Sequence, residues 1–168
     1  MLVDTASRSV PFLDRLRKRR DELERQFSFL RRLFTPRTIF MQFGAHDCAL
    51  ALRAAGYVER VYAVDAFDGL IREAARGVRL PSNLRFVDSR DLRSVDEGSV
   101  DVSFSDRLPV NRLRDIHGKL APQGKYVFQL HEMQKEVRAQ LLDAGFSAIK
   151  THVLENLLHN PSLLTALK

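Results

Sequence analysis

The sequence has few of the residues that define several classes of protein. Its one cysteine, Cys48, excludes a disulfide framework within the chain and any multi-cysteine zinc site. It has no tryptophan, and its three tyrosines do not cluster, so it lacks an aromatic platform on which single-stranded nucleic acid stacks. The histidines His117, His152 and His159 show no metal-ligand spacing with Cys48, and we expect no metal site.

Long apolar runs are also absent. None approaches the roughly 20 residues that a membrane helix needs. The first residues do not combine an early positive charge with an apolar block, as a secretory signal does. We therefore expect a cytoplasmic protein without a membrane segment. The 168 residues suit about one domain, and 45% hydrophobic with 29% charged residues is typical of a globular chain.

Basic residues exceed acidic ones, 27 to 21, which gives a net charge of +6. This charge permits an anionic partner such as nucleic acid, although many enzymes carry as much. The densest basic stretch is RLRKRR, residues 15–20. It either contacts nucleic-acid phosphates or forms the solvated face of a helix, and both interpretations stay open.

The stretch 11–34 has the periodicity of a helix, because apolar residues recur by threes and fours. They are Leu13, Leu16, Leu23, Phe27, Leu30 and Phe34, with Arg20 in the one gap. Thr35-Pro36 ends this helix, since the residue before proline avoids helical geometry. We expect an N-terminal helical extension over residues 1–36 and an α/β domain over 37–168. The apolar stripe packs either on the chain's own sheet or on a protein partner or second copy, as in a homodimer.

Strand and helix patterns alternate after residue 37. Strands are predicted at 38–43, 60–64, 84–87, 100–105, 125–130, 146–153 and 163–167, and helices at 48–55, 68–76, 111–120 and 132–144. This alternation predicts an α/β, Rossmann-like doubly wound, mostly parallel seven-stranded sheet. Such sheets bind ligands at the carboxyl ends of strands where strand order reverses.

The loop after the first strand reads GAHDC, residues 44–48. Gly44 suits a tight turn, and Asp47 suits a helix cap. The N–H groups at the start of a helix favour a carboxylate or phosphate. Many such turns are purely structural, so this loop alone does not decide the function.

Acidic residues follow the second and third strands. Asp65 stands about 20 residues after Gly44, where a carboxylate accepts hydrogen bonds from ribose hydroxyls, although it also suits a helix cap. Asp88 with Ser89 suits an adenine amino group and a ring nitrogen, although both residues are also ordinary in turns.

In this order and spacing, the loops resemble those of the class I S-adenosylmethionine-dependent methyltransferases, and more narrowly a bacterial type 11-like group. The first motif of that group reads roughly hydrophobic-E-I-G-x-G-D-C-A-L, and MQFGAHDCALAL stands in its place. Agreement continues through RVYAVDAFDGL, RLPSNLRFVDSRDL, EGSVDVSFSDRL and LAPQGKYVF to LLDAGFSAIKTHV. The resemblance covers about residues 37 to 153.

The resemblance implies S-adenosylmethionine as cofactor, with contacts from the ends of four strands. These are Gly44 to Cys48 for the methionine portion, Asp65 for the ribose, Asp88 with Ser89 for the adenine, and Ser105 with Asp106 facing the methyl group. Methyl transfer needs alignment and desolvation more than an acid or base. The candidate catalytic residues are Asp106 and His131, the latter as a general base or as a half-exposed neighbour of a helix start.

Departures from the family pattern concern the same site. Gln42 stands where an acidic residue usually receives the amino group of the cofactor, and an amide lacks the charge. His46 replaces the middle glycine, so a side chain occupies space near the ligand and resists positive φ. The segment from Ser105 to Gly124 and the loop after Leu130 are shorter than usual. Together the departures indicate a reduced or lost cofactor site.

Two functions therefore remain open. One is an S-adenosylmethionine-dependent methyltransferase acting on an unidentified acceptor. The other is a catalytically silent methyltransferase-like domain that binds a protein or a nucleic acid. The pair Gln42 and His46 is the sequence feature that bears most directly on the choice.

Overall fold

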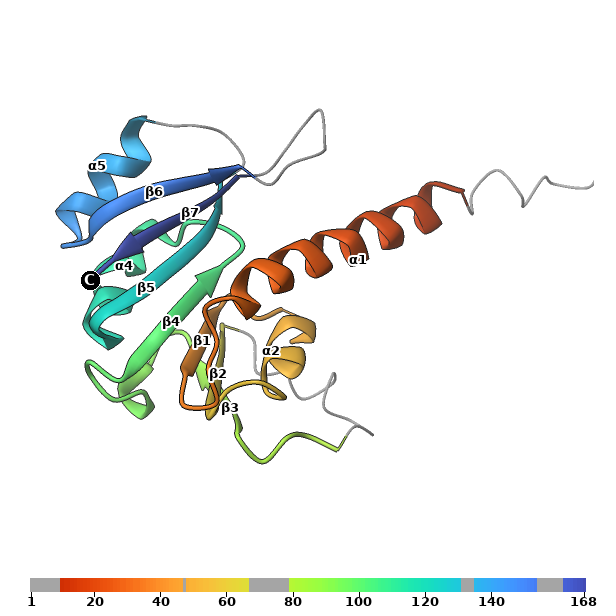
Figure 1. Cartoon of the computed structure of the whole chain (residues 1–168), viewed down its shortest axis with the longest axis horizontal. Coiled ribbons are helices and arrows are strands. Elements are labelled where there is room, and N and C mark those ends of the chain that lie inside the picture. The colour runs from red at the N-terminus through yellow and green to blue at the C-terminus, as the bar shows by residue number, and fades with distance from the viewer. Residues whose placement is uncertain (1–9, 47, 67–78, 131–134, 154–161) are drawn as a thin grey trace, which may run out of the picture.

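The computed structural model describes residues 10–46, 48–66, 79–130, 135–153 and 162–168. It shows one seven-stranded sheet with helices on both faces (Figure 1). The strands are β1 (Ile39–Phe43), β2 (Arg60–Asp65), β3 (Leu84–Asp88), β4 (Val100–Ser105), β5 (Leu120–Leu130), β6 (Ser147–Val153) and β7 (Ser162–Leu167). The α-helices are α1 (Val10–Arg31), α2 (Ala49–Ala54), α4 (Leu113–Lys119) and α5 (Lys135–Asp143), and the 3-10 helices are η2 (Leu92–Ser94) and η3 (Val110–Arg112).

The strand order is β3-β2-β1-β4-β5-β7-β6. The first five strands in that order run parallel, and β7 lies antiparallel to both β5 and β6. This arrangement confirms the predicted Rossmann-like, mostly parallel seven-stranded fold. The order reverses between β1 and β4, which places the ligand crevice of such a sheet at the carboxyl ends of these two strands.

Two apolar cores cover the two faces of the sheet. On one face, α4 and α5 pack against strand residues that include Tyr126 and Phe128. On the other face, α1 and α2 pack against residues that include Phe40 and Phe104. Burial on both faces explains why β1, β2 and β5 carry apolar residues at neighbouring positions, whereas β4 (VDVSFS) alternates apolar and polar residues.

The first helix contributes to this second core. Phe27, Leu30 and Phe34 are buried there, and Leu30 is fully inaccessible to solvent. The apolar stripe from Leu23 onward thus packs on the chain's own domain, and residues 17–31, the part of α1 with described side chains, leave no large apolar side chain exposed. Figure 1 shows the N-terminal part of α1 extending past the sheet. The boundary at residue 36 stays a prediction.

Element bounds differ from the prediction mainly at β5. This strand begins at Leu120, whereas a helix was expected over 111–120 and a strand over 125–130, with the stretch Ala-Pro-Gln-Gly (121–124) between them. The stretch forms a bulge, because Val100 pairs with Leu120 but Val102 pairs with Lys125. A Cβ at Gly124 would lie 2.8 Å from the Ala121 carbonyl oxygen, so the bulge requires glycine there. The predicted helix 68–76 and residues 132–134 lie outside the described residues.

None of the helices in the described ranges is long and apolar enough to cross a membrane. The cytoplasmic location stays a prediction.

Because Leu30 fills the core between α1 and the sheet, Leu30→Ala should lower the free energy of unfolding by about 2–5 kcal/mol, as large-to-small core changes do. Ser28→Ala, on the exposed side of the same helix, is the control and should change it by less than about 0.5 kcal/mol. Urea unfolding measures both variants. Equal small effects would mean that α1 is not part of the cooperative fold.

Candidate functional site

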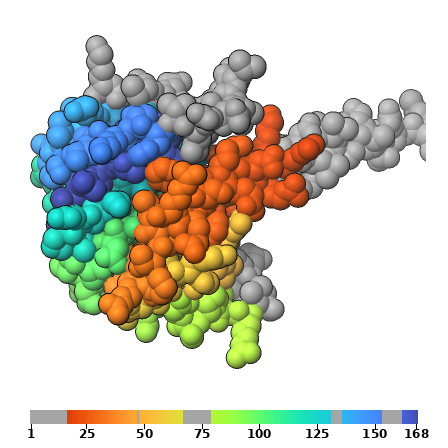
Figure 2. Space-filling view, in the orientation of Figure 1, coloured from red at the N-terminus to blue at the C-terminus, as the bar shows by residue number. Residues whose placement is uncertain are grey.

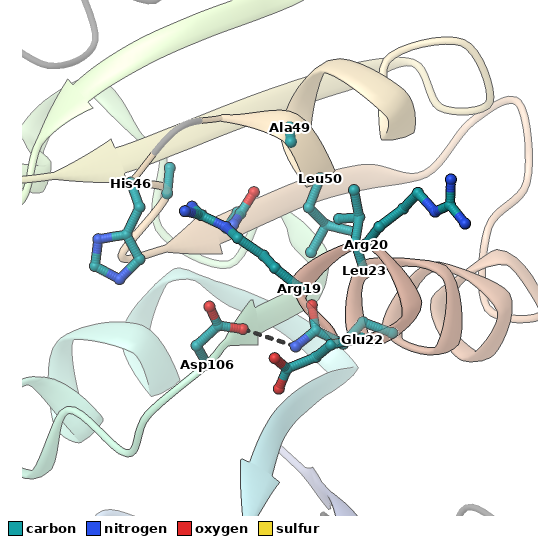
Figure 3. Close-up of a pocket in the computed structure, with 11 residues that line it drawn as sticks. Arg19, Arg20, Glu22, Leu23, His46, Ala49, Leu50 and Asp106 are labelled. Carbon is teal, nitrogen blue, oxygen red and sulfur yellow. Dashed lines mark hydrogen bonds between the residues drawn. The ribbon is translucent and has the colours of Figure 1, made fainter. Parts of the chain in front are cut away.

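A pocket of about 300 Å³ lies at the carboxyl ends of β1 and β4, beneath α1 (Figure 3). Its wall combines three segments: α1, the end of β1 with the following turn and α2, and the residue after β4. The lining residues are Arg19, Arg20, Glu22, Leu23, Gln26, Gln42, Ala45, His46, Ala49, Leu50 and Asp106. The pocket therefore occupies the crevice that the reversal of strand order predicts.

The turn after β1 has a left-handed backbone at three positions: Gly44 at φ 76°, His46 at φ 45° and Cys48 at φ 58°. The N–H groups of Gly44 and Ala45 both donate to the Val64 carbonyl oxygen, at 2.8 and 3.0 Å. His46 thus adopts the backbone conformation that its position in the turn demands, although non-glycine residues resist it. Its side chain is 61% exposed and lies at the rim of the pocket.

Asp65, at the end of β2, holds this turn. Its buried carboxylate accepts a hydrogen bond of 2.9 Å from the His46 N–H, and the His46 Nδ1 atom lies 3.7 Å away. A carboxylate that accepts from a backbone N–H stabilises a turn that positive φ angles disfavour. Asp65 is therefore next to the first-strand turn, as its spacing in the sequence suggested.

Gln42 is the buried polar residue of β1 that lines the pocket. Only 5% of its surface is exposed, and its Oε1 atom has no hydrogen-bond partner among the described residues. Leaving a buried acceptor unsatisfied costs about 1–3 kcal/mol, and most such atoms in proteins are paired. A ligand that donates a hydrogen bond to this oxygen would remove the cost of leaving it unpaired.

A buried hydrogen-bond network joins α1 to the ends of β4 and β5. The Gln26 Nε2 atom donates to the Asp106 Oδ1 atom at 3.0 Å and to the Gln129 Oε1 atom at 2.6 Å. The Gln129 Nε2 atom in turn donates to the Glu22 carboxylate. Both glutamines are at least nine-tenths buried. The network fixes α1 above the crevice and fixes the Asp106 carboxylate at its edge.

Two arginines of α1 add positive charge to the pocket wall. In Figure 3, Arg19 extends from α1 toward His46, whereas Arg20 points away from His46. Positive and negative side chains thus face one small volume from different elements. Such an arrangement suits a ligand that carries both a cationic and an anionic group.

Ser105 lies on the opposite face of the sheet and does not line the pocket. Its hydroxyl is 2.5 Å from the Tyr126 hydroxyl inside the other core, and burial raises the pKa of Tyr126. To face the methyl group, the Ser105 side chain would have to point into the pocket, whereas it points into the core on the opposite face of the sheet. The reason is the period of two along a strand, which turns Ser105 away while Asp106, just past the strand end, reaches the crevice.

Asp88 and Ser89 are also outside the pocket wall. The Arg90 guanidinium and N–H both donate to the Asp88 carboxylate and lower its pKa to about 2. The Ser89 N–H donates to the Asp65 carbonyl oxygen at 3.0 Å. In the free protein, both groups suggested for adenine recognition are thus engaged within the chain. Cys48 is buried at the start of α2, and His131 lies outside the described residues.

Residues from α1, together with Gln129, complete the site, and sequence reasoning did not assign them to it. A signal was present: Arg20 interrupts the apolar stripe of the helix, and the polar Glu22 and Gln26 stand beside Leu23 and Phe27. Polar residues on the inner side of an amphipathic helix indicate that this part of the helix faces something other than an apolar core.

No protein-family model matches the chain, and no curated protein sequence matches it. Solved structures do share its architecture. A tRNA (m1A58) methyltransferase from Aquifex aeolicus has a TM-score of 0.69 at 16% identity, over 86% of this chain and 68% of that one. A methyltransferase from Pyrococcus furiosus has a TM-score of 0.67 at 23% identity, and the match covers 86% of this chain and 82% of that one. An S-adenosylmethionine-dependent methyltransferase from Mesorhizobium loti has a TM-score of 0.62 at 15% identity, and the match covers 81% of this chain and 93% of that one. At such identities the similarity concerns the fold alone, which this chain shares with these three methyltransferases.

Proposed function

We propose that the chain binds S-adenosylmethionine in the pocket beneath α1 and transfers its methyl group to an acceptor. The observation that supports this most directly is the unpartnered, buried Oε1 atom of Gln42, in the same pocket as the Asp106 carboxylate. An acceptor that costs stability when empty is expected where a ligand donor completes the hydrogen bonding.

The methionine portion of the cofactor is a zwitterion, and the pocket offers groups for both of its charges. Its ammonium would donate hydrogen bonds to the Gln42 oxygen and to the Asp106 carboxylate, and its carboxylate would face Arg19. Asp106 thus supplies the negative charge that Gln42 lacks relative to the acidic residue usual in the family. The departure at position 42 is compensated by a neighbouring strand end.

The adenosine portion would lie on the side of β2 and β3. Asp65 would accept from the ribose hydroxyls, since a carboxylate has lone pairs beyond the one used by the His46 N–H. Asp88 would accept from the adenine amino group only after the Arg90 guanidinium is displaced. Cofactor binding is therefore expected to compete with this ion pair.

When bound, the cofactor supplies an electrophilic methyl group. The residues of this chain bind and orient: the turn from Gly44 to Cys48 and the network around Gln26 hold the pocket wall, and α1 keeps water from one side of it. Alignment and desolvation are the main requirements of such a transfer. His131 stays a candidate general base, and the type 11-like subgroup stays a prediction.

The alternative is a methyltransferase-like domain that has lost the cofactor. The engagement of Asp88 by Arg90 and the exposed imidazole of His46 at the pocket rim favour this alternative. The two proposals differ in whether the purified chain binds S-adenosylmethionine, so the binding experiment below separates them.

Calorimetry with S-adenosylmethionine and S-adenosylhomocysteine should show micromolar binding. Asp106→Asn should weaken it about tenfold or more, because an amide lacks the charge that faces the ammonium, and losing a charged hydrogen bond costs about 1.5–3 kcal/mol. Asp96→Asn is the matched control. Asp96 is exposed near the other end of β4, and its substitution changes the net charge by the same amount. Absence of both heat and thermal shift at millimolar ligand would establish the cofactor-free alternative.

Gln42→Leu should leave the free energy of unfolding unchanged or raise it by about 1 kcal/mol, because it removes an unsatisfied buried acceptor. The same variant should lose cofactor binding. Gln129→Leu is the control, as it is equally buried but hydrogen-bonded to Gln26, and should lower the free energy of unfolding by about 1–3 kcal/mol. Urea unfolding and calorimetry give the two readouts. Equal destabilisation by both changes would show that the Gln42 oxygen is satisfied in the free protein.

Arg90→Ala should strengthen binding of the cofactor severalfold, because it releases Asp88 from its ion pair. Arg93→Ala is a matched control: Arg93 pairs with Asp91 in the same local geometry, two residues apart, and Asp91 is not assigned to the cofactor. The affinity of Arg93→Ala for the cofactor should equal that of the unmodified protein. Weaker binding in Arg90→Ala would remove Asp88 from the adenine site. Calorimetry with S-adenosylhomocysteine measures both variants.

A further inference from the structure

The outer face of α1 carries a line of basic side chains. Lys18, Arg25 and Arg32 are seven residues apart, which is close to two helical turns, so they lie on one face at intervals of roughly 10 Å. Arg32 follows the last residue of α1 and continues its final turn, because its N–H donates to the Phe29 carbonyl oxygen. We refer to these three residues as the basic line.

Positive charge is concentrated in this segment. Residues 10–34 contain eight basic and four acidic residues, a net charge of +4 out of +6 for the whole chain. One of these acids, Glu24, pairs with Arg53 of α2. Within the part of the chain that the structure describes, the salt bridges include no partner for Lys18, Arg25 or Arg32. Unneutralised cations at regular intervals form a linear site for a linear polyanion.

The basic line starts beside the pocket. Lys18 precedes Arg19 and Arg20, which line the pocket, so one helix carries both the pocket wall and the line. Figure 2 shows α1 as a raised ridge that crosses the face of the molecule next to α2. A strand whose phosphates lie along α1 would therefore follow the helix that forms one wall of the pocket.

The chemistry of α1 favours a nucleic acid over a lipid surface. Helices that bind at a lipid surface insert large apolar side chains. The exposed large hydrophobic residues among the described side chains are Tyr57, Leu80, Val110 and Leu142, and none is on residues 17–31, the part of α1 whose side chains the structure describes. With Tyr57 as their single aromatic ring, base stacking contributes little, and contacts to the phosphate backbone must supply the affinity.

We propose that the methyl acceptor is part of a nucleic acid, held by its phosphates on Lys18, Arg25 and Arg32. This inference rests on the proposed function for the acceptor role, but the binding itself does not need the cofactor. Binding is expected to depend little on sequence and strongly on salt, since phosphate contacts carry no base information.

A fluorescently labelled RNA stem-loop tests this without cofactor, by anisotropy over a series of KCl concentrations. The triple variant K18Q/R25Q/R32Q should lower the affinity at low salt about tenfold or more, and should reduce the slope of log affinity against log salt by about 2–3. The matched control is R85Q/K125Q/K150Q, which removes three exposed positive charges from β3, β5 and β6. It should keep the slope of the unmodified protein. Circular dichroism and the unfolding midpoint establish that both variants are folded.

The outcomes separate the two proposals. Equal losses in the two variants, or no RNA binding at low salt, would overturn the basic line as a site. Displacement of the RNA by poly-glutamate at equal charge concentration would overturn the choice of nucleic acid in favour of an acidic polypeptide. RNA binding that depends on the basic line in a protein that gives no calorimetric signal with S-adenosylmethionine would retain the site, and the failure would then be that of the methyltransferase proposal.

Discussion

The hydrogen bonds of Gln26 determine most of what this fold presents to a ligand. A single buried amide joins the first helix to Asp106 after β4 and to Gln129 in β5. Through this junction, α1 supplies part of the pocket wall. The same junction explains why polar residues interrupt the apolar stripe of α1.

The turn after β1 shows how a non-glycine residue is accommodated in a glycine-like position. His46 has positive φ, and its N–H is held by Asp65, so the backbone path of the turn is kept while the imidazole extends to the rim. A left-handed non-glycine residue costs about 1–3 kcal/mol and persists where its surroundings enforce it. Histidine in place of glycine therefore adds an imidazole side chain at the rim of the pocket and leaves the backbone path of the turn largely unchanged.

The sequence predicted the fold well because the relevant signals are local. Neighbouring apolar residues mark β1 and β2, an alternation of apolar and polar residues marks β4, and Gly145 follows the helix before β6. The bulge that opens β5 was read as a turn, because proline and glycine mark both, and only pairing with Val100 distinguishes them. The site was less accessible to prediction. The order of strands brought Gln42, the Gly44 turn and Asp106 together as expected. The contribution of Arg19, Glu22 and Gln26 depends on the direction in which α1 crosses the sheet, which no local pattern specifies.

The position of β7 has a consequence for how the sheet is completed. β6 joins the sheet only through β7, which lies between it and β5. During synthesis β6 emerges first and has no neighbour to pair with until β7 follows. For that interval the edge of β5 is open, with the buried Tyr126 and Phe128 beside it. Exposed strand edges of this kind promote association between nascent chains. Pairing of β7 thus covers the edge of β5 and leaves β6 as the outer strand of the sheet.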